Sequence, residues 1–299
     1  MRDMTSTGNG PQDAPQSKNQ AKASRREELR QQMLRQQQAA RRKERTKLAG
    51  GVALVLVVIA AVAVGIVLSS RKSNNTPAPS TAASDSVIKA VTGVPASVID
   101  AVGKGTSVAS PTPISNPTPM TADGKPRVLY VGAEFCPYCA AERWSVVNAL
   151  SRFGTFTNLG ETSSSSTDVF PDTATLSFHG ASYTSDYLSF TGVEETDRNQ
   201  QPLDTLSAAD QKIFSALNPK GGIPFISFGG QYLTSGVGYD PSVLQKKTHQ
   251  QIADALSNPD SPITKAVIGQ ANAITATLCQ LTDQKPADVC SAAGVKAAS

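Results

Sequence analysis

The sequence predicts an α/β domain preceded by a single transmembrane helix. Residues 48–68 form an uncharged apolar run, and residues 127–133 (RVLYVGA) form a short apolar run typical of a strand buried on both faces. From residue 127 onward, patterns typical of strands and of helices alternate along the chain. This alternation is the order expected of an α/β fold.

The apolar run 48–68 is long enough to be a membrane anchor, because a helix needs roughly 20 apolar residues to cross the hydrocarbon core. A cleaved signal peptide is the alternative interpretation, but its apolar region is normally ~7–15 residues and lies close to the N-terminus. Here 47 residues precede the run, and it leads into Ser69, Ser70 and two basic residues. We therefore expect a retained, single-pass anchor.

Charge is distributed unevenly on the two sides of this run. Residues 1–72 contain 14 Lys and Arg against 5 Asp and Glu, whereas residues 73–299 contain 14 against 19. Five of the basic residues lie within residues 41–47, directly before the run. The positive-inside rule then predicts a cytoplasmic N-terminus and an extracytoplasmic C-terminal part, where disulfides persist.

The domain organisation follows from these features. Residues 1–47 are expected to be a disordered and then basic cytoplasmic segment, residues 69–84 a polar linker, and residues 85–299 the extracytoplasmic domain. The basic segment favours contact with anionic lipid headgroups. A nucleic-acid site is disfavoured because no aromatic residue is interleaved for base stacking.

The domain should begin with two short helices and a Pro-rich stretch. The helices are expected at residues 86–91 and 95–102, ended by Gly93 and Gly103, and the Pro-rich stretch at 111–119. The later elements are expected as a strand at 127–133, a helix from the CPYC motif to Phe153, strands at 156–159, 174–178 and 187–193, a helix at 207–217, a hairpin of 224–228 and 231–234, and helices at 241–256 and 262–281.

Cys136 and Cys139 form a Cys-x-x-Cys motif between a predicted buried strand and the start of a helix. The unpaired N–H groups and the positive end of the helix dipole stabilise a thiolate at the first cysteine. Pro137 suits the first helical turn, where its missing N–H has no cost. We therefore expect Cys136 to be the exposed attacking thiolate and Cys139 the more buried resolving thiol.

At these residues the chain resembles the thioredoxin superfamily, through the AEFC sequence that ends at Cys136 and the CPYC motif itself. A second landmark is Gly-Ile-Pro-Phe at residues 222–225, just before a predicted strand. The resemblance implies a thioredoxin-like fold and a cis bond at Pro224, in a loop that faces the dithiol. The substrate-binding residues that it implies are Ile223, Pro224, Pro137 and Tyr138.

More narrowly, the stretch VGAEFCPYCAAERWSVVNALSRFGTFTNL resembles a poorly characterised family of membrane-anchored thioredoxin-like proteins from actinobacteria and archaea. That resemblance covers about residues 86–290. It implies a fold and no substrate.

The chain departs from the thioredoxin pattern at Tyr130. Six residues before the first cysteine, the family often carries a buried acid that relays a proton to the resolving cysteine, and here that position is tyrosine. Glu134 and Glu142 are nearby in the sequence, but neither can be placed at Cys139 from the sequence.

A second departure is the length of chain between the first helix and Gly222, which predicts an insertion at residues 162–204. Aromatic residues in the insertion either belong to the core, which we favour, or line a substrate groove. They are Phe170, Phe178, Tyr183, Tyr187 and Phe190.

The other two cysteines, Cys279 and Cys290, lie eleven residues apart and are expected to form a structural disulfide. A second redox pair is the alternative. A four-cysteine zinc site fits poorly, because such sites usually repeat the close spacing in both halves. No metal and no organic cofactor is expected, since no cofactor fingerprint is present.

Histidine catalysis is not expected. His179 and His249 are the only histidines, and neither lies in a recognisable protease signature. A Cys–His protease would need one of them within hydrogen-bond reach of the thiol. His249, in a polar helix, is expected at the surface.

Together these features imply a thiol–disulfide oxidoreductase of the cell envelope acting on exported proteins. Oxidation is the favoured direction because exported proteins need disulfides made. A separate transmembrane redox partner would have to recharge the dithiol. The alternative is a non-catalytic thioredoxin-fold binding module in which Cys136 and Cys139 form a structural disulfide.

Overall fold

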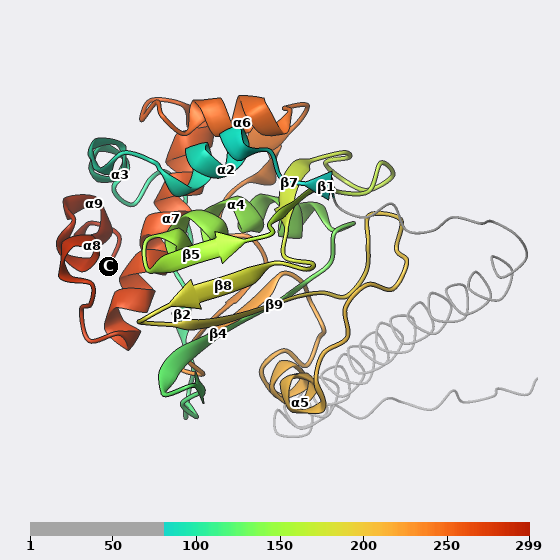
Figure 1. The fold of residues 1–299 in the computed structure, drawn as a ribbon, viewed down its shortest axis with the longest axis vertical. Helices are drawn as coiled ribbons and strands as arrows, with labels where there is room; N and C mark the ends of the chain where they lie inside the picture. The colour runs from blue at the N-terminus through green and yellow to red at the C-terminus, as the bar shows by residue number, and fades with distance from the viewer. Residues whose placement is uncertain (1–80) are drawn as a thin grey trace, which may run out of the picture. The chain divides into compact units, whose positions relative to one another are not determined.

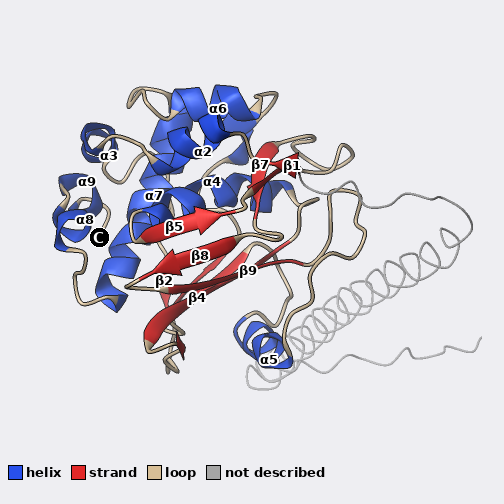
Figure 2. Cartoon of the chain, viewed as in Figure 1, coloured by secondary structure: helices blue, strands red, loops and turns tan. Residues whose placement is uncertain are grey.

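A computed structural model of the chain describes residues 81–299 (Figure 1). The predicted cytoplasmic segment 1–47, the predicted anchor 48–68 and the linker up to residue 80 lie outside the described residues. Within residues 81–299, no helix combines the length and the apolar character needed to cross a membrane. The described part is a mixed α/β structure (Figure 2).

The central sheet is built around β4, the longest strand of the described part, and contains both parallel and antiparallel pairs. β10 pairs antiparallel with β4 on one side, and β9 pairs parallel with it on the other. β11 and then β2 extend the sheet beyond β10, and β3 pairs with the start of β4. The strands are β2 (Thr112–Pro113), β3 (Thr121–Ala122), β4 (Lys125–Gly132), β9 (Ser189–Glu194), β10 (Phe225–Phe228) and β11 (Tyr232–Ser235).

Helices cover both faces of this sheet, with α4 and α7 on one face and α5 on the other (Figure 1). Side chains along β4 alternate between the two faces, as the pleat of a strand requires. Val128 and Tyr130 pack in the core under α4 and α7, whereas Leu129 and Val131 pack in a smaller core under α5. The helices are α4 (Pro137–Ser151), α5 (Ala208–Leu217) and α7 (Pro262–Leu281).

The remaining elements surround this sheet. Two smaller sheets join β1 to β6 and β7, and β5 to β8. Their strands are β1 (Thr81–Ala82), β5 (Gly154–Thr157), β6 (Gly160–Ser163), β7 (Ala174–Ser177) and β8 (Ser182–Ser185). The other helices are α2 (Asp85–Thr92), α3 (Ala96–Val102), the 3-10 helix η1 (Pro241–Leu244), α6 (His249–Ala255), α8 (Ala287–Ser291) and α9 (Ala293–Lys296).

Two sequence predictions are corrected by the structure. The helix expected at residues 241–256 is divided into η1 and α6, because the chain turns at Lys246 (φ +57°) and restarts at a capping box formed by Thr248 and Gln251. The stretch 162–204, expected to be an insertion, contains β9, which is a strand of the central sheet.

Candidate functional site

Cys136 lies at the point where the chain passes from the central sheet into α4. It is the N-cap residue of the helix, with extended backbone angles, and its Sγ accepts the backbone N–H of Cys139 at 3.2 Å. Pro137 occupies the first helical turn, where no N–H is needed. The sulfur therefore takes the place that a serine or threonine oxygen takes in an ordinary helix cap.

The two thiols have different environments. Both are buried: Cys136, which the sequence led us to expect exposed, is only 5% exposed, and Cys139 is not exposed at all. The pKa of Cys136 lies below its ordinary value, first because the Cys139 thiol donates a hydrogen bond to it, and further because of the backbone N–H groups of the first turn and the charge of Arg143. Complete burial raises the pKa of the Cys139 thiol well above its ordinary value. The arrangement favours one reactive thiolate beside one protonated thiol.

The loop before β10 brings Ile223 to the dithiol. β10 pairs with β4 so that Phe225 lies opposite Val131, which places the preceding residues at the end of β4 from which α4 starts. The thiol of Cys136 lies 3.9 Å from the carbonyl oxygen of Ile223, to which it can donate. The peptide bond between Ile223 and Pro224 is cis, as the family resemblance implies. The structure thus brings Ile223 to the sulfur of Cys136.

A buried ion pair lies beneath the dithiol. Nε and Nη2 of Arg143 donate to the two carboxylate oxygens of Glu194 at 2.7 and 2.6 Å, and Nη2 also donates to the carbonyl oxygen of Ala133. Both side chains are fully buried. Although burial opposes its charge, the carboxylate of Glu194 holds the pKa of Arg143 above its ordinary value. A permanent positive charge therefore lies within electrostatic range of both sulfurs.

Sequence reasoning missed this ion pair. Arg143 comes four residues after Cys139, on the same face of α4, so the helical spacing was a usable signal for a cation behind the dithiol. No spacing or motif in the sequence linked Glu194 to the dithiol. It reaches the site because the parallel register of β4 and β9 places it beside Gly132.

Tyr130 occupies the position at which the family resemblance implies an acid. Its ring is fully buried and packs edge-on against Phe178. Its hydroxyl lies over Gly132, where a Cβ atom would overlap the phenol. Within residues 81–299 neither this hydroxyl nor Nη1 of Arg143 has a hydrogen-bond partner.

Neither of the two glutamates singled out in the sequence forms a hydrogen bond to a cysteine within the described chain. The carboxylate of Glu134 accepts from Ser177 Oγ at 2.6 Å and from Thr162 Oγ1 at 3.2 Å. Glu142 accepts from the backbone N–H of Gly238 at 3.2 Å. The first carboxylate supports the β6–β7 sheet and the second ties α4 to the loop after β11.

The aromatic residues of stretch 162–204 divide between the two interpretations that the sequence left open. Phe178, Tyr183 and Phe190 form a cluster with Phe156, with ring centroids 4.8 to 6.0 Å apart. Phe178 belongs to the core, whereas Tyr183, Tyr187 and Phe190 are half-buried and pack against it. Phe170 differs, because its ring meets Tyr138, two residues after Cys136, at right angles.

The two histidines contact groups other than the cysteines. Nδ1 of His179 lies 2.7 Å from a carboxylate oxygen of Asp204. His249, expected at the surface, is half-buried, with 25% of its side chain exposed. Its Nε2 lies 2.7 Å from the carbonyl oxygen of Thr162 and 3.0 Å from that of Thr175. Within the described residues neither ring forms a hydrogen bond to a cysteine sulfur, and a Cys–His pair is not formed.

The predicted disulfide between Cys279 and Cys290 is confirmed, and its Cα atoms lie 5.6 Å apart. It links the C-terminal end of α7 to α8. Cys136 and Cys139 are free thiols, so the site is described in its reduced form.

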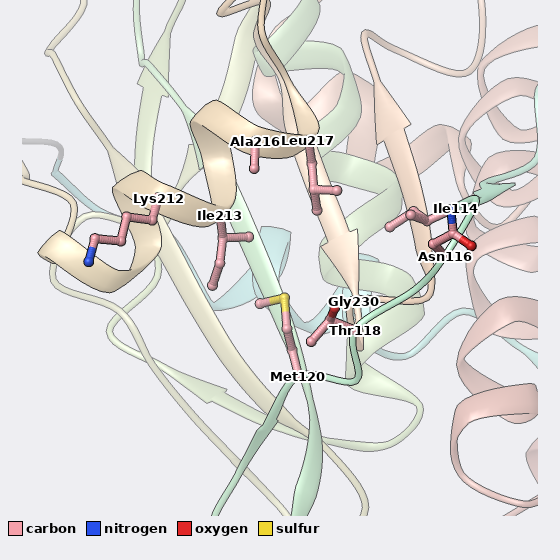
Figure 3. Close-up of a pocket in the computed structure, with 9 residues that line it drawn as sticks. All are labelled: Ile114, Asn116, Thr118, Met120, Lys212, Ile213, Ala216, Leu217 and Gly230. Carbon is pink, nitrogen blue, oxygen red and sulfur yellow. The ribbon is translucent and has the colours of Figure 1, made fainter.

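An apolar pocket of about 350 Å³ lies between α5 and the segment that leads into β3 (Figure 3). Ile213, Ala216 and Leu217 of α5 line one wall, and Ile114 and Met120 lie across from them (Figure 3). Neither cysteine of the dithiol contributes to its lining. The pocket is therefore separate from the thiol chemistry.

Comparison with known proteins identifies one similarity. Residues 113–221 match a family described as a domain of unknown function (DUF929). The match includes the dithiol and ends just before Ile223 and Pro224. No curated protein and no solved structure matches the chain.

Proposed function

We propose that this chain is a membrane-anchored, extracytoplasmic thiol–disulfide oxidoreductase that acts on exported proteins. The observation that carries the proposal is the placement of Cys136 Sγ at the N-cap of α4, where it accepts the N–H of Cys139 at 3.2 Å. A sulfur held there is stabilised as a thiolate, which is the reactive form in thiol–disulfide exchange.

The proposed scaffold is a thioredoxin-like fold. Three features support it: a Cys-x-x-Cys motif between a central strand and its helix, a cis-proline loop beside that motif, and helices on both faces of a mixed sheet. The match to a family of unknown function over residues 113–221 assigns neither a substrate nor a reaction.

In the oxidising direction, the Cys136–Cys139 disulfide accepts two electrons from a substrate dithiol. A substrate thiolate attacks Cys136 Sγ, the bond between the two protein sulfurs breaks, and Cys139 leaves as a thiolate that takes up a proton. A second substrate thiolate then attacks the substrate sulfur of the mixed disulfide and expels the Cys136 thiolate. The substrate gains a disulfide and the protein becomes the dithiol.

The environment of Cys136 favours this direction. A low thiol pKa makes Cys136 a good leaving group, which speeds the second step, and it stabilises the reduced protein, which makes the disulfide more oxidising. A transmembrane redox partner would return the dithiol to the disulfide. The proposed location outside the membrane rests on the apolar run 48–68 and on the basic residues 41–47 before it.

A cysteine trap tests the proposal. In full-length protein, Cys139→Ala removes the resolving thiol. The Cys136 thiolate can then attack a substrate disulfide and expel one substrate thiolate, but the resulting mixed disulfide is not resolved, so it should accumulate and appear as reductant-sensitive bands. Cys136→Ala is the matched control and should trap nothing. Absence of protein adducts from Cys139→Ala would overturn the oxidoreductase proposal.

The reduction potential of the Cys136–Cys139 pair tests the direction. A value of roughly −120 to −200 mV is expected for an oxidant or isomerase, and about −230 to −270 mV would indicate a reductase. Peptide mass analysis keeps this pair separate from Cys279 and Cys290.

A non-catalytic binding module is the second candidate function. The phenol of Tyr130, which stands where the family resemblance implies an acid, favours it, because a phenol with a raised pKa does not accept a proton as a carboxylate does. A potential below about −300 mV, typical of structural disulfides, would support this candidate.

A further inference from the structure

Two large apolar side chains within residues 81–299 are exposed to solvent, and both lie in the surroundings of Cys136. They are Tyr138, 39% exposed, and Val169, 49% exposed. Tyr138 belongs to the first turn of α4, and Val169 to the loop between β6 and β7. Phe170 connects them, because it follows Val169 in the chain and its ring meets that of Tyr138 edge-on, with the centroids 6.0 Å apart.

The loop between β6 and β7 is tied to the dithiol by its backbone. The N–H of Ser165 donates to the carbonyl oxygen of Phe135, the residue directly before Cys136, at 2.8 Å. The loop therefore forms part of the surface beside the reactive sulfur.

Phe170 is held in place within this loop. Its φ of +55° is a left-handed conformation that a bulky side chain rarely adopts. Its carbonyl oxygen accepts the hydroxyls of Ser164 at 3.1 Å and of Thr173 at 2.8 Å, which hold the backbone in this conformation. The aromatic ring beside Tyr138 is thus a fixed part of the surface.

The class of molecule that contacts this surface follows from the reaction at Cys136. Any thiol or disulfide that reacts with Cys136 brings its neighbouring residues across the adjoining surface, where Tyr138 and Val169 expose apolar area. Folded proteins bury most of their large apolar side chains, whereas unfolded segments expose them. The chemistry therefore fits a cysteine in a polypeptide segment that has not yet folded.

We propose that Tyr138, Val169 and Phe170 form an apolar subsite that binds a large apolar side chain adjacent to the substrate cysteine. This inference rests on the proposed function and adds a substrate class to it: cysteines flanked by apolar residues in unfolded polypeptide. Tyr138 and Val169 supply the exposed contact area, and Phe170 supports Tyr138 through the edge-on contact of their rings.

The test uses full-length protein carrying Cys139→Ala and two heptapeptides, Ser-Gly-Leu-Cys-Phe-Gly-Ser and Ser-Gly-Ser-Cys-Ser-Gly-Ser. Each peptide is supplied as its mixed disulfide with 2-nitro-5-thiobenzoate. The thiolate of Cys136 attacks the peptide sulfur, the peptide becomes bound to the protein, and the coloured thiobenzoate thiolate leaves. Absorbance gives the rate, and mass spectrometry gives the amount of protein–peptide adduct.

The protein is expected to prefer the apolar peptide, and Val169→Ser and Tyr138→Ser are each expected to reduce that preference. Loss of one buried apolar side chain should lower the ratio of the two rates by about tenfold. Val289→Ser, at a half-buried valine on α8, is the matched control and should keep the wild-type ratio. Thermal unfolding of each variant shows that it is folded.

Two results would overturn the inference, and only the second would also overturn the proposed oxidoreductase function. Equal rates for both peptides, or a ratio unchanged by both substitutions, would remove the subsite and leave the proposed function intact. Failure to release thiobenzoate from either peptide would remove the proposed function together with the subsite.

Discussion

Arg143 and Glu194 form a bidentate ion pair in the interior, with N···O distances of 2.7 and 2.6 Å, and neither side chain is exposed. Arg143 comes from the helix that carries the dithiol, and Glu194 comes from the end of β9. The pair therefore fixes α4 to the central sheet and places a positive charge behind the two sulfurs. We interpret Arg143 as a positioning residue, since it acts on the reacting sulfur through its charge without touching a substrate.

Arg143→Met is expected to destabilise the protein by about 3–5 kcal/mol, because it leaves the carboxylate of Glu194 buried without a partner. Urea unfolding measures this change. The single tryptophan, Trp144, is fully buried and donates its indole N–H to the carbonyl oxygen of Ala174 at 3.0 Å, so its fluorescence reports loss of the core.

The double variant Arg143→Met with Glu194→Leu is the control for this prediction. It removes both charges, so most of the lost stability should return. A double variant less stable than Arg143→Met would show that the carboxylate is not left unpaired in the single variant.

The charge of Arg143 should also be visible in the reactivity of Cys136. Alkylation of the reduced protein by iodoacetamide should follow a pH profile with a midpoint below the ordinary thiol pKa, because the Cys139 hydrogen bond, the first helical turn and Arg143 stabilise the thiolate. Cys139, with a raised pKa and no exposure, should react only after unfolding.

Arg143→Met should move the Cys136 midpoint to higher pH, and Arg143→Lys should restore part of the shift because it keeps the charge. Lys265→Met, which removes a surface charge, is the control and should leave the midpoint unchanged. A merely structural role for Arg143 would change stability without moving the midpoint in either variant.

The elements were predictable from sequence where their signals are local. The helices at residues 207–217 and 262–281 have the expected ends, because Ser207 caps the first and Pro262 occupies the first turn of the second. The division of the helix expected at 241–256 also has a local signal in the sequence, the Thr248-x-x-Gln251 capping box.

The candidate site was predictable only in part. Cys136, Pro137 and Cys139 lie within four residues, so the cap geometry follows from local chemistry. Glu194 reaches the site through the pairing of β4 with β9, strands about 60 residues apart, and the loop around Phe170 is closed by the pairing of β6 with β7. The register between two strands is not encoded by either strand alone. The exposure of Val169 could not be predicted from sequence either, because it depends on how the loop between β6 and β7 packs in the folded protein.

The Cys279–Cys290 disulfide is expected to act on stability alone. Replacing both cysteines by alanine should lower the free energy of unfolding by about 2–3 kcal/mol, the effect of opening a loop of this length. Urea unfolding measures the loss, and alkylation of Cys136 should keep its wild-type rate. A changed rate would indicate a redox relay between the two pairs, which was the alternative in the sequence.

Glu142 should make the stability of the protein depend on pH near neutrality. Burial raises its pKa from 4.5 to about 7, although the hydrogen bonds that its carboxylate accepts from the N–H of Gly238 and the amide of Gln270 oppose this rise. Between pH 4.5 and 7 the folded protein therefore binds more protons than the unfolded chain. Stability from this group is fully present below about pH 4.5 and is lost as the pH rises through 7, a change of about 3 kcal/mol.

Glu142→Gln should abolish this contribution, because the amide cannot ionise and can donate to Oε1 of Gln270, which has no partner within residues 81–299. The free energy of unfolding, measured by urea at pH 5 and pH 8, should therefore fall less with rising pH in the variant than in the wild type. Asp186→Asn, at an exposed carboxyl, should retain the wild-type difference. If Glu142→Gln kept the full wild-type pH dependence, that dependence would come from other groups, and the pKa of Glu142 would not be raised in the folded protein.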